Sequence, residues 1–338
     1  MRSRLKLLVL APAYFPSNGG VERHIRAVVS VLKKQRVDVT IAVRYKSSYP
    51  KSQIVDGVKV LRMPKRDNRI AWQYWSRVNG RLLNHIDVVH SHDVFPFTLR
   101  QINKEKRWIH TFHGYEGYPV EKSAIISRQA VAKSADYTFG IGAFIEKWYG
   151  TKCDEVLYGA SNQELGHKLK EEWDVVYYGR LEEDTGFQEY LKGFALASKN
   201  NPDLSLVVLG DGSLMSWARG FAEEHGLKVD FEGMVESVFD YLASSKIAYV
   251  SGYLGIIEAG VHELPIIAQY NSPIKKDYLE LHPMAKYMHI VSDPESIAQA
   301  TRNANNENSI RLKQVKKWAT GQTWQNVADK YRTAYQVD

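Results

Sequence analysis

Short apolar runs alternate along the chain with longer segments of helical periodicity. One such segment places Val21, Ile25, Val28 and Leu32 on one face of a helix. The alternation predicts parallel sheets that are covered by helices, which is an α/β fold. A first series of strands is predicted at residues 5–11, 37–43, 58–62, 87–90, 108–112, 137–140 and 155–158. A second series is predicted at residues 174–178, 204–209, 228–231, 247–250, 265–268 and 288–291.

The two series of strands predict two domains. A chain of 338 residues is longer than a typical single domain, and a polar stretch at 159–172 separates the series. We therefore expect one domain over 1–165 and a second over 166–338, with the boundary near residue 165. The spacing of Trp324, Val327 and Tyr331 predicts a final helix over about 323–337 that has a packing role.

Composition excludes several classes of protein. Apolar runs are too short, or too often interrupted by charge, for the roughly 20 residues of a membrane span. The basic and then apolar start resembles a signal peptide only superficially, and we interpret it as the first strand. The single cysteine, Cys153, excludes an internal disulfide and a cysteine-rich metal site, and is typical of a reducing compartment.

Charge is distributed unevenly along the chain. Residues 1–165 hold 27 Lys and Arg against 14 Asp and Glu, a net charge of +13, whereas the rest of the chain carries −6. This asymmetry favours an anionic partner of the first half, such as a membrane surface, a phosphorylated lipid carrier or an acidic glycan. The alternative is an uneven surface composition without function.

Basic and aromatic residues interleave between residues 62 and 81. Lys65, Arg66 and Arg69 lie next to Trp72 and Trp75, which is the composition of a segment that binds a membrane interface. The alternative is that Trp72, Trp75, Val78 and Leu82 form the buried stripe of an ordinary helix. Nucleic-acid binding is not expected, because no known nucleic-acid motif accompanies the basic residues.

Several glycine-containing motifs follow predicted strands. Gly19 and Gly20 close a loop before a helix, where backbone N–H groups can bind a phosphate. Later in the chain come Tyr178-Gly179-Arg180-Leu181, Leu209-Gly210-Asp211-Gly212, Phe231-Glu232-Gly233-Met234-Val235 and Ile256-Ile257-Glu258-Ala259-Gly260. With Asp87-Val88-Val89-His90-Ser91-His92 and Thr111-Phe112-His113-Gly114, these motifs resemble, in their order and spacing, the GT-B glycosyltransferases of family 4.

The resemblance covers nearly the whole chain and implies a fold and an activity. The fold would be two Rossmann-like domains that face a central cleft, with a C-terminal helix that crosses back to the N-terminal domain. The activity would be metal-independent, retaining transfer of a sugar from a UDP- or GDP-linked donor to a lipid-linked or acidic glycan acceptor. The N-terminal domain would bind the acceptor, and the protein would be cytoplasmic, either free or peripheral on the inner face of a membrane.

The resemblance also implies roles for particular residues. Arg180 would stabilise the leaving diphosphate, and its planar guanidinium suits phosphate oxygens. His113 would lie near the reaction centre and bind a sugar hydroxyl or move a proton. The remaining residues expected to bind the nucleotide sugar are Gly19, Gly20, Gly210, Gly233, Met234, Val235, Ile257 and Glu258, the last at the start of a helix, where it would accept hydrogen bonds from the ribose.

One further group has the spacing of metal ligands. His90, His92 and Asp93 lie close together in sequence, but we interpret them as structural residues and expect no metal site.

Two positions depart from the family pattern. Thr185 stands where the family has a lysine that gives the diphosphate a second positive charge, and three acids precede it. Lys192 is a conceivable substitute. The segment 249–258 is shortened and lacks a first glutamate that contacts the donor sugar. These departures leave two alternatives, a non-catalytic GT-B subunit that supports a partner enzyme and a nucleotide-sugar epimerase.

Overall fold

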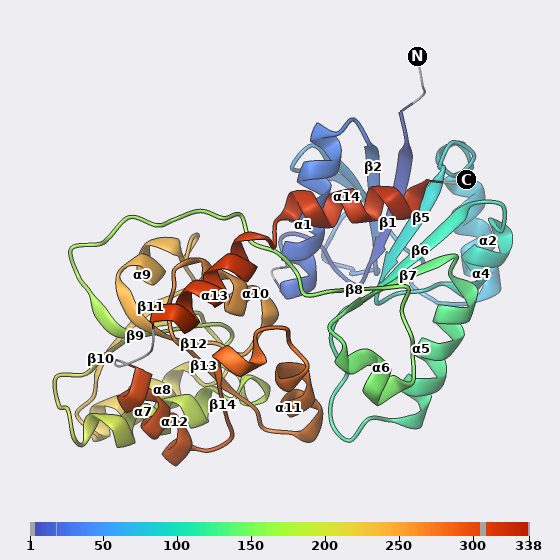
Figure 1. Ribbon diagram of the computed structural model, residues 1–338. Coiled ribbons are helices and arrows are strands. Elements are labelled where there is room, and N and C mark those ends of the chain that lie inside the picture. Colours follow the sequence, from blue (N-terminus) through green and yellow to red (C-terminus); the bar gives the residue numbers. More distant parts are fainter. Residues whose placement is uncertain (1–3, 18, 305–308, 337–338) are drawn as a thin grey trace. The chain divides into compact units, whose positions relative to one another are not determined.

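The chain divides into two compact units. The computed structural model describes residues 4–17, 19–304 and 309–336. Unit 1 comprises Met1–Leu157 together with Trp324–Asp338, and unit 2 comprises Tyr158–Thr323. The last helix, α14 (Trp324–Tyr335), therefore belongs to unit 1, where it packs on α1 (Gly20–Lys34) (Figure 1). Each unit is built around its own sheet.

Unit 1 has an eight-stranded sheet in the order β3-β4-β2-β1-β5-β6-β7-β8. All neighbouring strands are parallel except β3 and β4. The chain moves outward in one direction after β1 and in the other from β5 onward, so the strand order reverses between β1 and β5, where α/β sheets bind ligands. The strands are β1 (Lys6–Ala11), β2 (Asp38–Val43), β3 (Ser52–Val55), β4 (Val58–Arg62), β5 (Val88–His92), β6 (Arg107–Phe112), β7 (Tyr137–Ile141) and β8 (Glu155–Leu157).

Helices connect the parallel strands of unit 1. The helix α1 begins at Gly20, and its stripe of Ile25, Val28 and Leu32 is buried, as its periodicity predicts. The other helices before β8 are α2 (Arg69–Val78), α3 (Gly80–Leu83), α4 (Phe97–Ile102), α5 (Lys122–Ser134) and α6 (Phe144–Tyr149).

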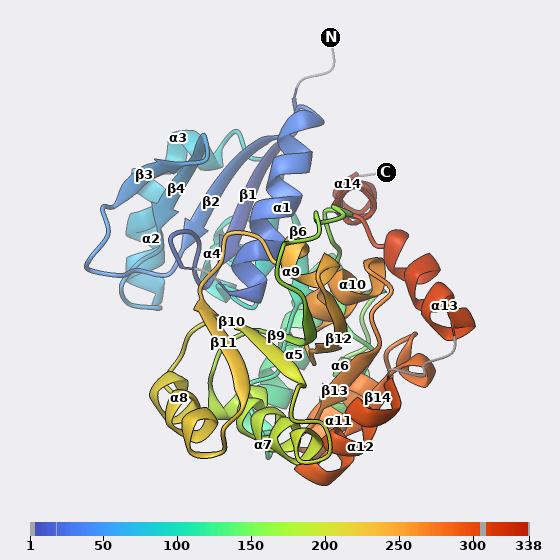
Figure 2. The ribbon, with the colours of Figure 1, turned by 90° about the vertical axis from the view of Figure 1, so that its left-hand side faces the viewer.

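Unit 2 has a six-stranded parallel sheet in the order β11-β10-β9-β12-β13-β14. Its strand order reverses between β9 and β12, so the carboxyl ends of these two strands are the expected ligand position. Figure 2 shows β9, β10 and β11 side by side in this sheet. The strands are β9 (Trp173–Tyr178), β10 (Ser205–Leu209), β11 (Lys228–Gly233), β12 (Ser245–Tyr249), β13 (Ile266–Gln269) and β14 (His289–Val291).

The helices of unit 2 include two short 3-10 helices, η1 and η2. Helices α7 and α12 pack on each other, as do α10 and α13. The elements are η1 (Glu183–Thr185), α7 (Phe187–Ser198), α8 (Met215–Glu224), α9 (Phe239–Ala243), α10 (Tyr253–Val261), α11 (Pro273–Glu280), η2 (Ala285–Tyr287), α12 (Pro294–Ala304) and α13 (Ser309–Thr320). No helix among the described residues is both long and apolar enough to cross a bilayer.

All predicted strands are present, and one strand was not predicted. β3 pairs antiparallel with β4 through a turn in which Asp56 and Gly57 both have positive φ (50° and 67°). The pair forms the edge of the unit 1 sheet in Figure 2. An Asp-Gly pair between two extended segments is a strong hairpin signal, so the sequence contained the information.

The segment after β4 has a buried aromatic stripe, as in an ordinary helix, and also an exposed apolar stripe, as in a segment that binds a membrane interface. Trp72 and Trp75 are buried, and their indole N–H groups donate to Asp67 and to the carbonyl of Arg62. Val78, in contrast, is 64% exposed, so the expectation that it belongs to the buried stripe is wrong. A different stripe of α2 faces solvent, formed by Ile70, Tyr74 and Val78 at intervals of four residues.

Candidate functional site

Three of the predicted glycines meet at the carboxyl edge of the unit 2 sheet. Gly179, Gly210 and Gly233 lie at the ends of β9, β10 and β11, and all have positive φ. The Gly210 N–H donates to the carbonyl of Gly233 (2.7 Å). A Cβ on Gly210 would lie 1.9 Å from the carbonyl oxygen of Gly179, so no other residue fits there without movement. The three glycines leave this edge free of side-chain bulk.

Arg180 lies two residues after the end of β9 and is exposed at this edge. Its guanidinium forms an ion pair with Asp184 (2.7 Å), and the side chains of both residues are more than half exposed. Because the pair is open to water, it stabilises the fold little, and Arg180 can exchange its partner for an anionic ligand at small cost. The guanidinium therefore lies beyond the carboxyl end of a strand at which the strand order reverses, and its role as a phosphate-binding cation stays a prediction.

The acids before Thr185 do not form one block of negative charge. Glu182 accepts a hydrogen bond from the Ser213 backbone N–H (3.0 Å) and another from its hydroxyl, and Asp184 pairs with Arg180. The Thr185 hydroxyl contacts the carbonyls of Arg180 (2.9 Å) and Glu182 (2.7 Å). Thr185 thus fixes the turn that carries Arg180, and it supplies no charge.

Helix α10 begins beside this loop, at the end of β12. Gly252 is its N-cap in an extended conformation, without a side-chain cap. The expectation that Glu258 lies at the start of the helix is wrong, because the helix begins at Tyr253 and Glu258 is in its second half. Glu258 is only 3% exposed, and its contact with a ribose stays a prediction.

The other predicted nucleotide residues differ in exposure. Met234 is 65% exposed next to the end of β11, and Val235 is half-buried. Ile257 is fully buried in a cluster with Val261 and Ala319, so its side chain packs in the core of unit 2 and leaves at most backbone for a ligand.

A lysine that the sequence reasoning missed lies at the start of α10. The Lys275 Nζ, from α11, donates to the carbonyl of Ser251 (2.6 Å), directly before the N-cap Gly252. Burial lowers the pKa of Lys275 to about 7. Nothing in the sequence distinguishes Lys275 from its neighbour Lys276, because their difference arises only from the side of α11 on which each lies.

Lys192, the substitute cation considered from the sequence, has a different environment. It lies on α7, and its Nζ forms an ion pair with Glu189 one turn earlier (3.2 Å).

In unit 1, Gly19 and Gly20 form the predicted junction before α1. Gly19 is the extended N-cap and Gly20 the first helical residue, and a Cβ on Gly20 would meet nothing within 4 Å. His24 lies one turn later on the buried side of this helix. His24 was not among the predicted site residues, although it lies three residues after Val21 on the apolar face, which was a usable signal.

The carboxyl ends of β5 and β6 carry a cluster of buried histidines. His92 Nδ1 and His113 Nε2 are 2.9 Å apart and share a hydrogen bond. The His113 backbone N–H also donates to Asp93 (2.9 Å). His24 packs edge-on against the His113 ring, with centroids 4.9 Å apart. These contacts fix His113 from three sides.

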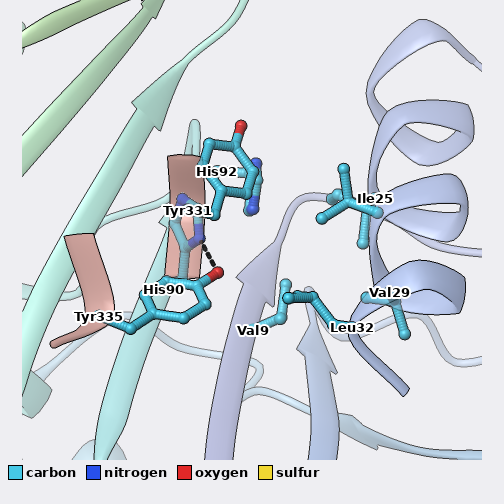
Figure 3. A pocket seen from close by; sticks show the side chains of 9 residues that line it. Val9, Ile25, Val29, Leu32, His90, His92, Tyr331 and Tyr335 are labelled. Carbon is cyan, nitrogen blue, oxygen red and sulfur yellow. Dashed lines mark hydrogen bonds between the residues drawn. The ribbon is translucent and has the colours of Figure 1, made fainter. Parts of the chain in front are cut away.

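Helix α14 completes the histidine cluster. The Tyr331 hydroxyl contacts His24 Nε2 (2.9 Å), and the Tyr335 hydroxyl contacts His90 Nδ1 (2.7 Å). His90 Nε2 contacts the Thr111 hydroxyl (2.8 Å). Figure 3 shows His90, His92, Tyr331 and Tyr335 on one side of a small cavity and the apolar side chains of β1 and α1 on the other. The polar atoms of the cluster therefore form hydrogen bonds with one another in apolar surroundings.

Burial keeps these histidines neutral. It holds the pKa of His24, His90, His92 and His110 well below the usual value. It lowers the pKa of His113 to about 3, assisted by the positive charge of Arg128. Asp93 is affected in the opposite direction, because burial raises its pKa to about 6. At neutral pH His113 is thus an uncharged hydrogen-bonding group.

Within the described residues, the group with the proximity of metal ligands is His24, His92 and His113, whose ligand atoms lie within 4.8 Å of one another. It is a different group from His90, His92 and Asp93. Imidazole nitrogens suit zinc and related metals, so these three residues could hold one. Binding would require the His92–His113 hydrogen bond to break, because both nitrogens would have to face the ion. We therefore describe the group as hydrogen-bonded.

Comparison with known proteins matches each unit to a glycosyltransferase family model. A family model described as Glycosyltransferase Family 4 matches residues 18–157, and one described as Glycosyl transferases group 1 matches residues 162–318. Together they cover nearly the whole of both units. No curated protein matches the sequence.

Solved structures show the same fold at low sequence identity. Anabaena HepE in complex with UDP and glucose has a TM-score of 0.73 and 11% identity, with 98% of this chain and 99% of that chain covered. The E. coli trehalose-6-phosphate structure with UDP-2-fluoro glucose has a TM-score of 0.69, 11% identity and coverage of 98% and 99%. A glycosyltransferase from Rickettsia africae has a TM-score of 0.71, 13% identity and 98% coverage of both chains.

The family models, the two parallel α/β sheets and the shared fold lead to one conclusion. The chain belongs to the GT-B glycosyltransferases of the family-4 type, enzymes that transfer a sugar from a nucleotide-sugar donor.

Proposed function

We propose that this enzyme transfers a sugar with retention of configuration, without a metal, from a UDP- or GDP-linked donor to a lipid-linked or glycan acceptor. The observation that carries the proposal is the position of Arg180, an exposed cation beside a glycine edge where the strand order of unit 2 reverses. We favour UDP as the donor nucleotide, because Anabaena HepE and the E. coli structure have UDP or a UDP-sugar bound.

In this proposal Arg180 stabilises the diphosphate as it leaves. Negative charge grows on the diphosphate oxygens while the glycosidic bond breaks, and a guanidinium aimed at them lowers the barrier. Gly210 and Gly233 let the nucleotide approach the backbone, and the exposed Met234 borders the base. Sugar transfer in this proposal does not depend on a strong nucleophile from the protein, because charge stabilisation and positioning of the substrates supply most of the rate acceleration.

His113 is proposed to bind a hydroxyl of the transferred sugar. A pKa of about 3 makes it a poor base for proton transfer at neutral pH, so of its two expected roles the hydrogen-bonding one is favoured. His92 and Asp93 hold the imidazole and its backbone in place.

The stripe of α2 formed by Ile70, Tyr74 and Val78 is proposed to bind an anionic membrane surface where the acceptor lies. These side chains are 79%, 71% and 64% exposed. Exposed basic residues surround them, so apolar insertion and attraction to anionic headgroups act together. The basic residues are Lys65, Arg66, Arg69, Arg77 and Arg81.

The transfer reaction is tested with the purified chain and a panel of UDP- and GDP-sugars offered with lipid-linked acceptors. We expect a product with the donor's anomeric configuration, seen by NMR, and an unchanged rate in EDTA. Inversion would contradict retention, and a loss of rate in EDTA would direct attention to His24, His92 and His113. No product with any donor would favour a non-catalytic subunit, and an altered sugar formed without acceptor would favour an epimerase.

Membrane binding is tested by vesicle sedimentation. Replacing Ile70, Tyr74 and Val78 together by serine should reduce binding to anionic vesicles at least tenfold, and salt should weaken the wild type. Ile126→Ser is the matched control, because Ile126 is an equally exposed isoleucine on another helix of unit 1. Equal losses in the control and the triple variant would contradict the role of α2.

A further inference from the structure

Within the part of the chain that the structure describes, Lys275 is held at the start of α10 without an acidic partner in an ion pair. Among the described residues, its ammonium contacts the carbonyl of Ser251 (2.6 Å) and the ring of Tyr278, whose centroid is 4.1 Å away. Most lysines are kept in water or paired with a carboxylate, because burial of an unpaired charge is costly. An anion that arrives beside the ammonium would supply the missing charge.

Lys275 and Arg180 lie near the same loop. Arg180 pairs with Asp184, and the charge of Asp184 also acts on Lys275, where it partly opposes the effect of burial on the pKa. The Asn271 side chain, just before α11, donates to the backbone carbonyl of Asp184 (3.5 Å). The turn that carries Arg180 and the start of α11 are therefore neighbours within unit 2.

Helix α10 adds a third favourable element. Ser251 and Gly252 follow β12, on the side of the sheet where the strand order reverses. The first turn of a helix offers backbone N–H groups and the positive end of its dipole to an anion. Lys275 places its amine at this same turn, so an arginine, a lysine and a helix start converge at one end of unit 2, and an anion bound there would favour the protonated form of the amine.

The other lysines considered pair with carboxylates on their own helices. Lys276, the next residue on α11, pairs with Glu280 (3.6 Å), and Lys192 pairs with Glu189 (3.2 Å). Both are helix-surface pairs that are open to solvent. Lys275 differs from them in that its surroundings provide a carbonyl and a ring in place of a carboxylate.

We propose that Lys275 binds the diphosphate of the nucleotide donor together with Arg180, and supplies the second positive charge that Thr185 does not. This proposal rests on the proposed function of unit 2 as the donor site. It assigns the diphosphate to the space between the Arg180 turn and the first turn of α10.

Calorimetry with UDP and UMP tests the role of Lys275. We expect Lys275→Met to weaken UDP binding about tenfold to a hundredfold, because a charge-assisted contact is lost. UMP, which lacks the second phosphate, should be affected less, so the preference of the protein for UDP over UMP should shrink. Lys276→Met is the matched control and should leave both affinities unchanged. GDP and GMP replace UDP and UMP if the wild type binds guanine nucleotides.

Each outcome of the titration decides one question. If the wild type binds neither UDP nor GDP, the donor site itself is refuted. If it binds UDP and Lys275→Met binds UDP equally well, the role of Lys275 alone is refuted. Lys275→Arg keeps the charge and should retain most of the affinity. An equal loss in the Arg and Met variants, with unchanged melting temperatures, would show that the diphosphate does not use the charge.

Discussion

The two units present opposite chemistry at the carboxyl ends of their central strands. In unit 1 the polar side chains are histidines, buried and neutral, which bind one another and the tyrosines of α14. In unit 2 the polar side chains are charged, and Arg180 and Asp184 lie in water beside bare glycine backbone. Two sheets of similar topology therefore support different tasks.

The difference fits the ligand that we propose for each edge. A diphosphate carries charge, and an exposed arginine can bind it without a large desolvation penalty on either side. A sugar hydroxyl is neutral, and a fixed, uncharged imidazole binds it through a directional hydrogen bond and not through charge. We interpret unit 1 as a preorganised polar site and unit 2 as an electrostatic site.

The largest expected effect is acid sensitivity of the folded state, caused by the histidines of unit 1. A buried histidine has its pKa lowered on folding, so the unfolded chain binds more protons below pH 6.5, and the folded state loses stability as pH falls. Each histidine should cost about 1.4 kcal/mol between pH 7.5 and 5.5, and five together on the order of 7 kcal/mol. Asp93 offsets a small part, because its raised pKa acts with the opposite sign.

Urea unfolding at the two pH values measures this effect. His110→Asn should reduce the difference in unfolding free energy, because a buried titrating group is removed, whereas His225→Asn should not, because His225 is exposed. A free energy of unfolding that is independent of pH over this range would show that the cluster is accessible to protons.

In unit 2, Arg180→Ala should reduce sugar transfer about a hundredfold to a thousandfold, because the leaving diphosphate loses its cation. Lys192→Ala is the control, since its ion pair with Glu189 lies on the surface of α7. Steady-state rates with a saturating donor measure the effect. Equal rates for Arg180→Ala and the wild type would contradict the electrostatic role proposed for this edge.

His113→Ala should reduce transfer about tenfold to a hundredfold and leave UDP affinity unchanged, because the residue is proposed to contact the sugar and not the nucleotide. His85→Ala, an exposed histidine of the same unit, is the control. The pairing of a rate assay with calorimetry separates the two effects. A parallel loss of UDP affinity in His113→Ala would indicate structural damage instead.

The smallest effects concern the glycines of the two edges. Gly210→Ala should destabilise the protein by about 2 kcal/mol, because the new Cβ meets the Gly179 carbonyl in a left-handed conformation. Gly20→Ala should be neutral or stabilising by up to about 1 kcal/mol, because it adds a helix former in open space. Thermal unfolding of both variants gives the comparison, and similar changes in stability would contradict it.

Sequence patterns predicted the elements better than the side-chain environments. Every predicted strand exists because apolar runs and turn residues are local signals, and β3 was missed only because the Asp56-Gly57 turn was overlooked. The location of Arg180 followed from its place after a strand. The contrast between Lys275 and Lys276 could not be predicted, because it depends on which side of α11 meets Ser251.

The histidine cluster shows the same limit in unit 1. His90, His92 and His113 were each noticed, but the partners that make them a cluster come from α1 and α14, far away in sequence. His90, His92 and Asp93 have the spacing of metal ligands along the chain, but the residues that approach His92 in the folded sheet are His24 and His113. Local pattern identifies candidate residues, and tertiary packing decides their chemistry.

The most direct test of the account is calorimetric titration of UDP and GDP, alone and as their sugars, into the wild-type protein and Arg180→Ala. We predict micromolar binding of one nucleotide by the wild type and at least tenfold weaker binding by Arg180→Ala. Absence of binding by every nucleotide, or equal binding by both proteins, would contradict the assignment of unit 2 as an electrostatic donor site.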